Sequence, residues 1–189
     1  TAASAISDGH TPAFLHMNYG QRTEKRELKS FNDIGDHYRI KERLVVDISH
    51  LSNIGGSCLT DTQIDVPDAN LENPDIPVSY VPFRNANILS AAVSWAEILK
   101  ATAIYVGAVE EDSSGYPDCR RSFFDAFESV IDTGTKPETN IKIATPLIAL
   151  SKKEIVEKGI SLNAPLHLTW SCYQNDDVPC KECDSCVIR

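Results

Sequence analysis

Hydrophobic residues recur along the chain at two spacings, one typical of β-strands and one typical of amphipathic helices. Short apolar runs rich in β-branched residues predict four strands, at residues 13–17, 44–48, 103–106 and 141–143. Apolar residues three and four positions apart predict helices, at residues 1–7, 23–38, 85–99, 123–131 and 151–159. Helices of this length between strands act as right-handed crossovers. The pattern therefore predicts the α/β class with a mostly parallel sheet.

Polar residues and glycine mark the expected helix ends. Thr23 is a predicted N-cap, and Ser151 followed by Glu154 has the spacing of a capping box. Gly159 is predicted to end that last helix, because glycine favours the left-handed conformation found after helix C-termini. Ligands of open α/β sheets bind beyond the carboxyl ends of the strands. We therefore expect the chemistry in the loops at residues 18–22, 50–80 and 109–121.

Composition narrows the class of protein. The 189 residues suggest one main domain with a small appendage, and 42% hydrophobic residues suffice for an ordinary buried core. No apolar run approaches the length that crosses a bilayer, so we expect a soluble protein without a membrane partner. The formal net charge of -9 argues against a nucleic-acid partner, because surfaces that bind phosphate backbones are basic. Small-molecule chemistry fits this charge better.

Four cysteines near the end of the sequence form the most specific chemical motif. Cys172, Cys180, Cys183 and Cys186 have the spacing C-x7-C-x2-C-x2-C. A Cys-x2-Cys turn lets two sulfurs face one point, and zinc prefers four soft ligands in a tetrahedron. The spacing therefore predicts a structural zinc site that orders this end of the chain.

Disulfides and an iron–sulfur cluster are the alternatives to zinc. Six cysteines are present when Cys58 and Cys119 are counted, but the sequence does not resemble a small secreted disulfide scaffold. A C-x2-C-x2-C run also occurs in ferredoxins, where a fourth cysteine and a proline follow it. Here Val187 follows the last cysteine, which favours zinc. Cys58 and Cys119 have no base beside them in the sequence, which argues against a nucleophilic role for either.

Charged residues gather in the loop after the third strand. The side chains are those of Glu110, Glu111, Asp112, Asp118 and Arg120. Paired carboxylates can hold a divalent cation, and an arginine can grip a carboxylate or phosphate through two parallel hydrogen bonds. A solvated acidic loop is the simpler interpretation of the same charge pattern.

Arg84 and Asn85 stand at a helix start and could contact a ligand. Arg84 supplies a fixed cation, and the amide of Asn85 can hydrogen-bond the edge of a heterocycle, although a helix cap by Asn85 explains its position equally well. The five histidines are scattered, without an HExxH pair. The sequence contains no Walker phosphate loop, G-x-S-x-G elbow or dinucleotide glycine fingerprint.

Four blocks, taken together and in this order, resemble one enzyme family. They are NYGQR at 18–22, VPFRN at 81–85, GAVEEDSSGYPDCR at 107–120, and the final cysteine array. In this combination the chain resembles the 7-cyano-7-deazaguanine synthases (QueC), which form preQ0 in queuosine biosynthesis. The resemblance runs over most of the chain.

The resemblance implies a fold, a reaction and cofactors. The fold is a Rossmann-like parallel sheet of the adenine nucleotide alpha hydrolase or ATP pyrophosphatase type, with a nucleotide-binding domain at 1–165 and a zinc-binding segment at 166–189. The enzyme is an ATP-dependent ligase that forms carbon–nitrogen bonds. It converts 7-carboxy-7-deazaguanine and ammonia to the nitrile through an adenylated carboxylate. ATP and Mg²⁺ serve as substrate and activator, and a structural Zn²⁺ binds the four cysteines.

Loop position and side-chain chemistry, read with the resemblance, suggest site residues but no catalytic one. The residues expected to border the substrate are Arg84, Asn85, Tyr116, Asp118 and Arg120. The residues expected near the nucleotide are Asn18, Tyr19 and Gln21.

One family feature is not found in the sequence. The phosphate-binding loop Ser-Gly-Gly-x-Asp-Ser and the strand before it are expected ahead of the first helix, and we expect them upstream of Thr1 rather than lost. Two alternatives to the synthase stay open, another tRNA-modifying enzyme of the ATP pyrophosphatase type and a zinc-containing binding module without catalysis. We further expect a cytoplasmic protein, with a homodimer as the predicted assembly.

Overall fold

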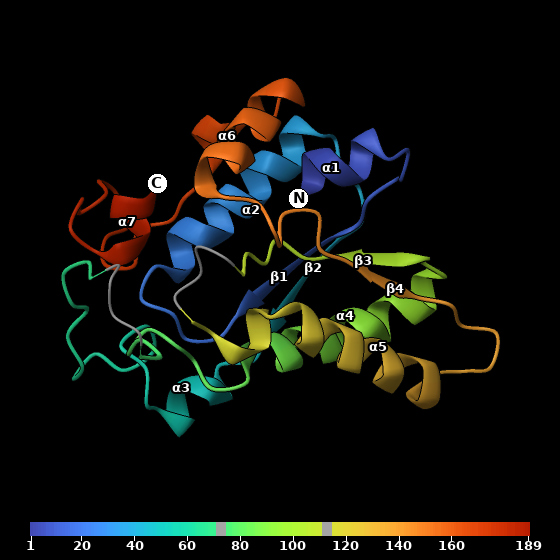
Figure 1. Ribbon diagram of the computed structural model, residues 1–189, viewed down its shortest axis with the longest axis horizontal. Coiled ribbons are helices and arrows are strands. Elements are labelled where there is room, and N and C mark those ends of the chain that lie inside the picture. Colours follow the sequence, from blue (N-terminus) through green and yellow to red (C-terminus); the bar gives the residue numbers. More distant parts are fainter. Residues whose placement is uncertain (71–74, 111–114) are drawn as a thin grey trace. The chain divides into compact units, whose positions relative to one another are not determined.

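The computed structural model describes residues 1–70, 75–110 and 115–189. The chain divides into two compact units, and each unit is built from two separate stretches of sequence. The first unit contains residues 1–11 and 83–158, and the second contains residues 12–82 and 159–189. Each unit holds one pair of parallel strands and its own helices (Figure 1).

The first unit contains the strands β3 (Ala103–Tyr105) and β4 (Lys142–Ala144), which pair in parallel with Ala103 opposite Lys142. Its helices are α1 (Ala2–Ser7), α4 (Arg84–Leu99), α5 (Arg121–Gly134) and a short 3-10 turn, η1 (Pro117–Cys119). The helix α5 lies in the crossover between the two strands, as the parallel pairing requires.

Two helices and a strand supply the core of the first unit. Phe124 and Ile131 of α5 pack with Leu89 of α4 and with Ile141 and Ile143 at β4. The spacing of the two α5 residues is the helical periodicity predicted from the sequence. Burial of each large side chain is worth about 1.5–3 kcal/mol, so this cluster accounts for much of the unit's cohesion.

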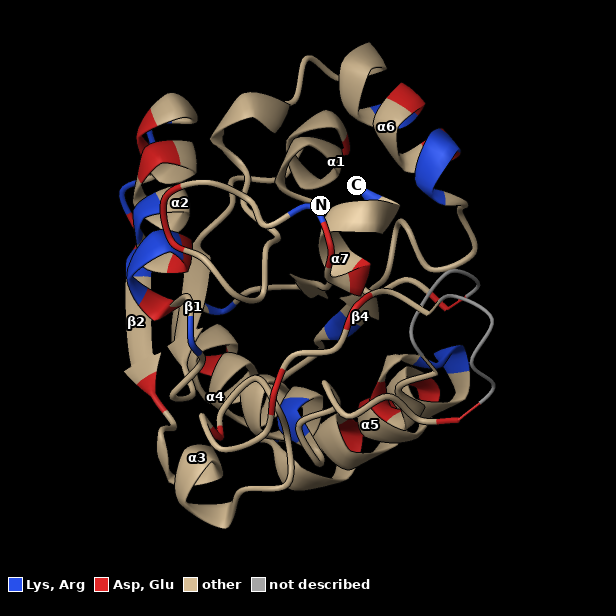
Figure 2. Ribbon diagram, turned by 90° about the vertical axis from the view of Figure 1, so that its left-hand side faces the viewer, with Lys and Arg blue, Asp and Glu red and all other residues tan. Residues whose placement is uncertain are grey.

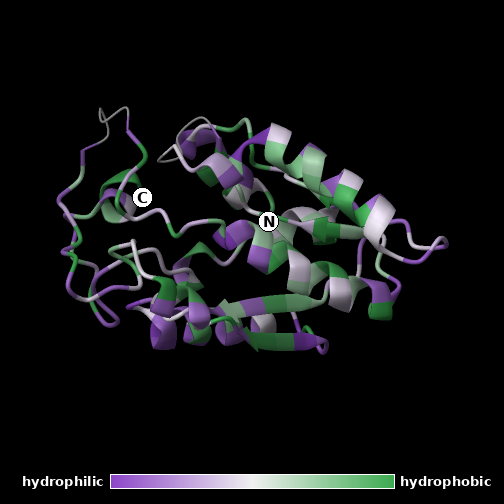
Figure 3. Ribbon diagram, turned by 90° about the horizontal axis from the view of Figure 1, so that it is seen from below, coloured by the Kyte–Doolittle hydropathy of each residue, from purple (hydrophilic) through white to green (hydrophobic). Residues whose placement is uncertain are grey.

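The second unit contains the strands β1 (Phe14–Asn18) and β2 (Arg43–Asp47), paired in parallel from Phe14 opposite Arg43 to Asn18 opposite Asp47. Its helices are α2 (Glu24–His37), α3 (His50–Ile54), α7 (Asp184–Ile188) and the 3-10 turn η2 (Leu166–Leu168). Both strands contain hydrophobic and hydrophilic residues (Figure 3), and α2 carries charges of both signs (Figure 2).

The predicted strands and helices are present, with ends that differ by one or a few residues, but the strands form two separate two-stranded sheets. Lys142 and Ala144 face β3, since Lys142 N–H donates to Thr102 O and Ala144 O accepts from Val106 N–H. The N–H of Ile143 points the other way and donates to Glu128 Oε1 at 2.6 Å. A carboxylate of α5 thus closes the outer edge of β4 to a further strand. The observed class is α/β with parallel strands.

The helix α6 (Lys152–Ser161) corrects one prediction. Its capping box is confirmed, because Glu154 Oε2 accepts from the Ser151 N–H at 2.8 Å. Gly159, however, does not end the helix, which continues to Ser161. The left-handed residue is Asn163, at φ 52°, and Ala164 N–H donates to Gly159 O at 2.8 Å. Asparagine tolerates this conformation better than most residues, so it takes the place expected of glycine.

Within the described residues, no helix is both long enough and apolar enough to span a membrane. The sequence predicts a nucleotide-binding domain at 1–165 and a zinc-binding segment at 166–189. That division describes which ligand each segment binds, and it stays a prediction.

Candidate functional site

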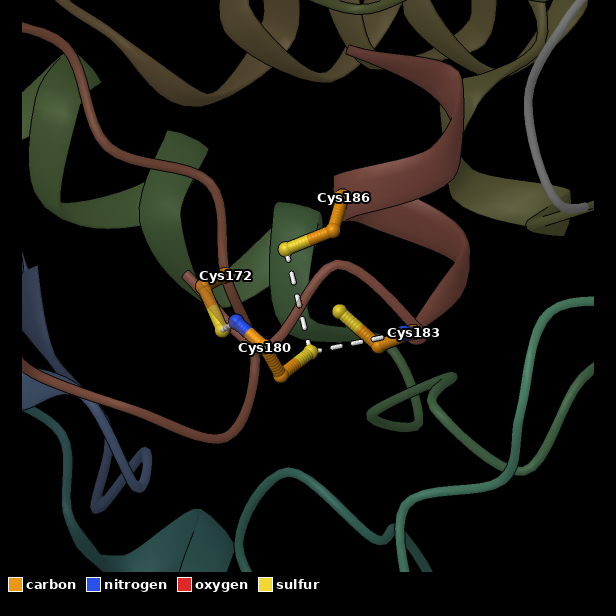
Figure 4. A group of neighbouring side chains, drawn as sticks. All are labelled: Cys172, Cys180, Cys183 and Cys186. Carbon is orange, nitrogen blue, oxygen red and sulfur yellow. Dashed lines mark hydrogen bonds between the residues drawn. The ribbon is translucent and has the colours of Figure 1, made fainter. Parts of the chain in front are cut away.

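The four predicted cysteines converge in the second unit (Figure 4). Their sulfurs all lie within 4.8 Å of one another, and Cys180 Sγ is 3.8 Å from Cys186 Sγ. A zinc–sulfur bond of about 2.3 Å in a tetrahedron gives sulfur–sulfur separations of about 3.8 Å. The cluster is therefore of the right size to hold a metal ion through four sulfur ligands.

Backbone N–H groups surround the sulfurs of the cysteine cluster. Cys172 Sγ accepts from the N–H groups of Gln174, Asn175 and Cys180, each at 3.4 Å, and Cys180 Sγ accepts from Cys183 N–H at 3.4 Å. Such donors stabilise thiolates, which are the form that binds metal. The turn from Cys180 to Cys183 contains Lys181, whose backbone lies in the left-handed region at φ 70°.

The thiols of the cluster differ in how readily they ionise. Burial opposes ionisation of Cys180, but the N–H groups of Cys183 and Glu182 outweigh it and lower the pKa of Cys180 to about 7. Burial raises the pKa of Cys186 to about 12, and the neighbouring cysteines add to the rise. A divalent cation is the group that would allow all four sulfurs to ionise together.

Cys58 lies near this cluster as a fully buried side chain, 0% exposed. Burial raises the pKa of its thiol, the Arg22 guanidinium opposes the rise, and Asp184 and Cys183 add to it. A buried thiol with a raised pKa is a poor nucleophile. The absence of a nucleophilic role for Cys58 stays a prediction.

Three residues predicted near the nucleotide lie at the end of β1 in the second unit: Asn18 is the last residue of the strand, and Tyr19 and Gln21 follow it. Gln21 is buried, and its side chain links the loop to α2. Its Oε1 accepts from Tyr19 N–H at 2.8 Å, and its Nε2 donates to Glu27 Oε2 at 3.2 Å. Asn18 O accepts from Ile48 N–H at 2.7 Å. Gln21 therefore shapes this loop.

Gly20 is needed for a reason the sequence did not suggest. Its φ is 79°, and a Cβ placed on it would lie 2.6 Å from the Cβ of Ser52 in α3. Glycine is therefore required at this position because the backbone passes close to α3, a helix of the same unit.

Four of the five residues predicted to border the substrate come together in the first unit. Asn85 N–H donates to Asp118 Oδ2 at 2.9 Å, and Asn85 Nδ2 donates to Asp118 O at 2.9 Å. The Arg84 guanidinium lies 5.9 Å from the centre of the Tyr116 ring. Tyr116 and Asp118 are buried, whereas Arg120 is exposed at the start of α5.

The structure corrects the proposed helix cap by Asn85. The helix α4 begins at Arg84, and its N-cap is Phe83 in the left-handed conformation, at φ 58°. The side-chain oxygen at the helix start comes from Asp118, which is distant in the sequence. Asn85 instead links the helix to the loop at 116–120.

Sequence reasoning missed the contact between Asn85 and Cys119. Asn85 Nδ2 donates to Cys119 Sγ at 3.2 Å, so this thiol lies beside the residues predicted to border the substrate. Burial raises the pKa of Cys119, and the Asp118 charge adds to the rise. The only signal for Cys119 in the sequence was its place in the GYPDCR block.

Glu111 and Asp112 lie outside the described residues, and Glu110 Oε2 accepts from Arg121 N–H at 3.1 Å.

Comparison with known proteins identifies the family. The family model described as "Queuosine biosynthesis protein QueC" matches residues 1–189. The chain belongs to the QueC family. A relative named 7-cyano-7-deazaguanine synthase from Chlorobaculum parvum is 57% identical over 187 residues, covering 99% of this chain and 82% of the relative.

Two further relatives of the same name support the QueC assignment. The Chlorobium chlorochromatii protein is 58% identical and the Chloroherpeton thalassium protein 57% identical, each over 189 residues. The alignments cover all of this chain, and 83% and 84% of the two relatives. The resemblance drawn from the four sequence blocks is confirmed.

Proposed function

We propose that this QueC protein is an enzyme that acts as a 7-cyano-7-deazaguanine synthase in queuosine biosynthesis. The observation that carries the proposal is the family match over the whole chain, together with relatives of that name at 57–58% identity. The match favours the synthase over the two alternatives, another tRNA-modifying enzyme and a non-catalytic binding module.

The reaction requires activation of an unreactive carboxylate. A carboxylate oxygen of 7-carboxy-7-deazaguanine attacks the α-phosphorus of ATP, and pyrophosphate leaves. Ammonia then attacks the acyl carbon, AMP leaves with the carboxylate oxygen, and an amide remains. A second ATP activates the amide oxygen in the same way, and loss of AMP and a proton gives the nitrile. Mg²⁺ would neutralise the charge of the departing pyrophosphate.

We assign the substrate to the group at the start of α4. Arg84 is the cation of this group suited to a carboxylate, because a guanidinium offers paired N–H donors. Asp118 and Asn85 hydrogen-bond each other, so they position Arg84 and Tyr116 beside the deazapurine. Arg120 is expected at the exposed border of the same site. Asn18 and Tyr19 are expected near the nucleotide in a Rossmann-like fold of the ATP pyrophosphatase type, with Gln21 holding their loop.

We assign a structural Zn²⁺ to Cys172, Cys180, Cys183 and Cys186. Four sulfurs within 4.8 Å of one another, with backbone N–H groups directed at two of them, support this assignment. Bound zinc would supply positive charge and cross-link the segment, and would take no part in the reaction. A homodimer and a cytoplasmic location stay predictions.

Oxygen labelling tests the reaction sequence. With substrate labelled by ¹⁸O in both carboxylate oxygens, each oxygen should leave in AMP. Mass spectrometry should then find two singly labelled AMP molecules per nitrile. Label in water or in phosphate, with nitrile still formed, would overturn adenylation of the carboxylate while leaving the synthase assignment intact.

A further inference from the structure

Arg22 binds a part of the chain that lies far from it in the sequence. Its guanidinium donates to three backbone oxygens, those of Cys58 at 2.7 Å, Asp61 at 2.9 Å and Ile64 at 2.7 Å. Its own N–H donates to Leu59 O at 3.0 Å. Both the backbone and the side chain of Arg22 are therefore committed to one segment, residues 57–70, which we name the bridging segment.

The bridging segment also contacts the region around the cysteine cluster. Three hydrogen bonds make the connection: Gln174 Nε2 to Val66 O at 3.4 Å, Ala69 N–H to Glu182 O at 2.9 Å, and Asn70 N–H to Asp184 Oδ1 at 3.0 Å. Glu182 and Asp184 flank the metal-site residue Cys183, which is fully buried. The bridging segment is thus held by Arg22 at one end and by the cysteine region at the other.

The bridging segment has little regular structure of its own to keep it in place. No helix or strand lies within residues 57–70. Backbone carbonyls removed from water need hydrogen-bond partners, and a guanidinium can serve three at once because its five N–H groups form a fixed fork. Its first residues also bond one another and Val78 O, which accepts from Cys58 N–H at 2.9 Å. Beyond these bonds, the conformation of the segment depends on its two anchors.

We propose that Arg22 is a positioning residue that couples metal binding at the cysteine cluster to the conformation of the loop at residues 18–22. Metal fixes the turns that contain Glu182 and Asp184, these hold residues 69 and 70, and the carbonyls of the bridging segment fix Arg22. Arg22 directly follows Gln21, whose side chain closes the loop. The consequence for nucleotide binding rests on the proposed function, whereas the coupling itself does not.

Hydrogen exchange tests the coupling on the full chain without any assay of activity. Amide exchange is compared by mass spectrometry between zinc-loaded and chelator-treated protein. In the wild type, zinc removal should speed exchange in the bridging segment and also at residues 18–22. In Arg22→Gln, the zinc-dependent change at residues 18–22 should disappear. A variant that is merely less stable would exchange faster everywhere, with or without zinc, and would keep the zinc dependence.

The matched control is Lys25→Gln, which removes a positive charge from an exposed position of α2 close to Arg22 in the sequence. It should keep the zinc-dependent change at residues 18–22. Zinc removal that leaves residues 18–22 unchanged in the wild type would overturn the proposal, as would an Arg22→Gln variant that responds like the control.

Zinc affinity gives a second measurement that does not need a folded zinc-free protein. Coupling is reciprocal, so a loop that depends on zinc must in turn favour zinc binding. Competition with a chromophoric chelator should show zinc affinity reduced by about tenfold in Arg22→Lys, which keeps the charge but loses the fork. Lys25→Gln should match the wild type. Equal affinities in all three proteins would contradict the proposal, even if the zinc-free forms unfold.

Discussion

Asp118 shows at the scale of one residue which contacts of a predicted site residue the sequence does not reveal. The sequence placed Asp118 beside the substrate because it lies in an acidic loop after a strand. In the structure the side chain is 3% exposed, and its Oδ2 receives the N–H of Asn85 at 2.9 Å. This long-range contact leaves no trace in local sequence.

Replacing Asp118 should therefore destabilise the protein. Asp118→Ala leaves the Asn85 N–H without its acceptor, which should lower the free energy of unfolding by about 1–3 kcal/mol. Asp118→Asn keeps an acceptor oxygen and should lose less. Urea unfolding measures both, with the exposed Asp132→Asn of α5 as the control. An Asp118→Ala variant as stable as the wild type would show that the contact contributes nothing.

Arg84 is the residue on which we place the largest functional effect. Arg84→Ala should reduce turnover by about tenfold or more, because a hydrogen bond to a charged group is worth about 1.5–3 kcal/mol. Zinc content should not change, since the cysteine cluster belongs to the other unit. Steady-state kinetics with metal analysis checks this, and Lys153→Ala, at an exposed position of α6, is the control. Unchanged turnover would remove Arg84 from the site.

Elements were predicted well where the signal is local. The capping box at Ser151 and the helical spacing of Phe124 and Ile131 depend on neighbours in the sequence, and both are confirmed. The splitting of the strands into two sheets was not predicted. Strand pairing joins residues far apart in the sequence, which periodicity does not encode.

The packing of β1 against α2 predicts a pH effect. His16 of β1 lies against Phe31, with ring centres 5.2 Å apart, and burial lowers the pKa of His16 although Glu27 opposes the shift. The unfolded chain therefore binds a proton at higher pH than the folded protein does. The contribution of His16 to stability is fully present above its ordinary pKa of 6.5, and is lost as pH falls through the lowered folded value.

The measurement is urea unfolding of the wild type and of His16→Leu at about pH 7.5 and about pH 5, with zinc in excess. The wild type should lose more stability than His16→Leu on acidification. Equal losses in the two proteins would show that His16 does not titrate differently on folding.

The cysteine segment gives a prediction about metal content. Cys183→Ser should lower bound zinc and solubility together, because three thiolates hold zinc more weakly and the segment loses its cross-link. Cys119→Ser, outside the cluster, should retain its zinc. Elemental analysis of the purified proteins decides the matter, and a full zinc complement in Cys183→Ser would contradict the four-sulfur site.

At the scale of the whole molecule, the cysteine cluster and the family could be predicted from sequence because short motifs indicate both. The C-x7-C-x2-C-x2-C spacing alone predicted that four sulfurs converge, and the structure places them within 4.8 Å of one another. The links between Arg22, the bridging segment and the cysteine region could not be predicted, because the bridging segment takes part through backbone groups that any residue could provide.

The measurement that tests the central claim most directly is product analysis by mass spectrometry. The purified, zinc-loaded gene product is incubated with 7-carboxy-7-deazaguanine, magnesium-ATP and ammonium. We predict 7-cyano-7-deazaguanine together with AMP, and neither product when ATP or ammonium is omitted. Intact zinc-loaded protein that forms neither nitrile nor AMP would contradict the assignment as a synthase.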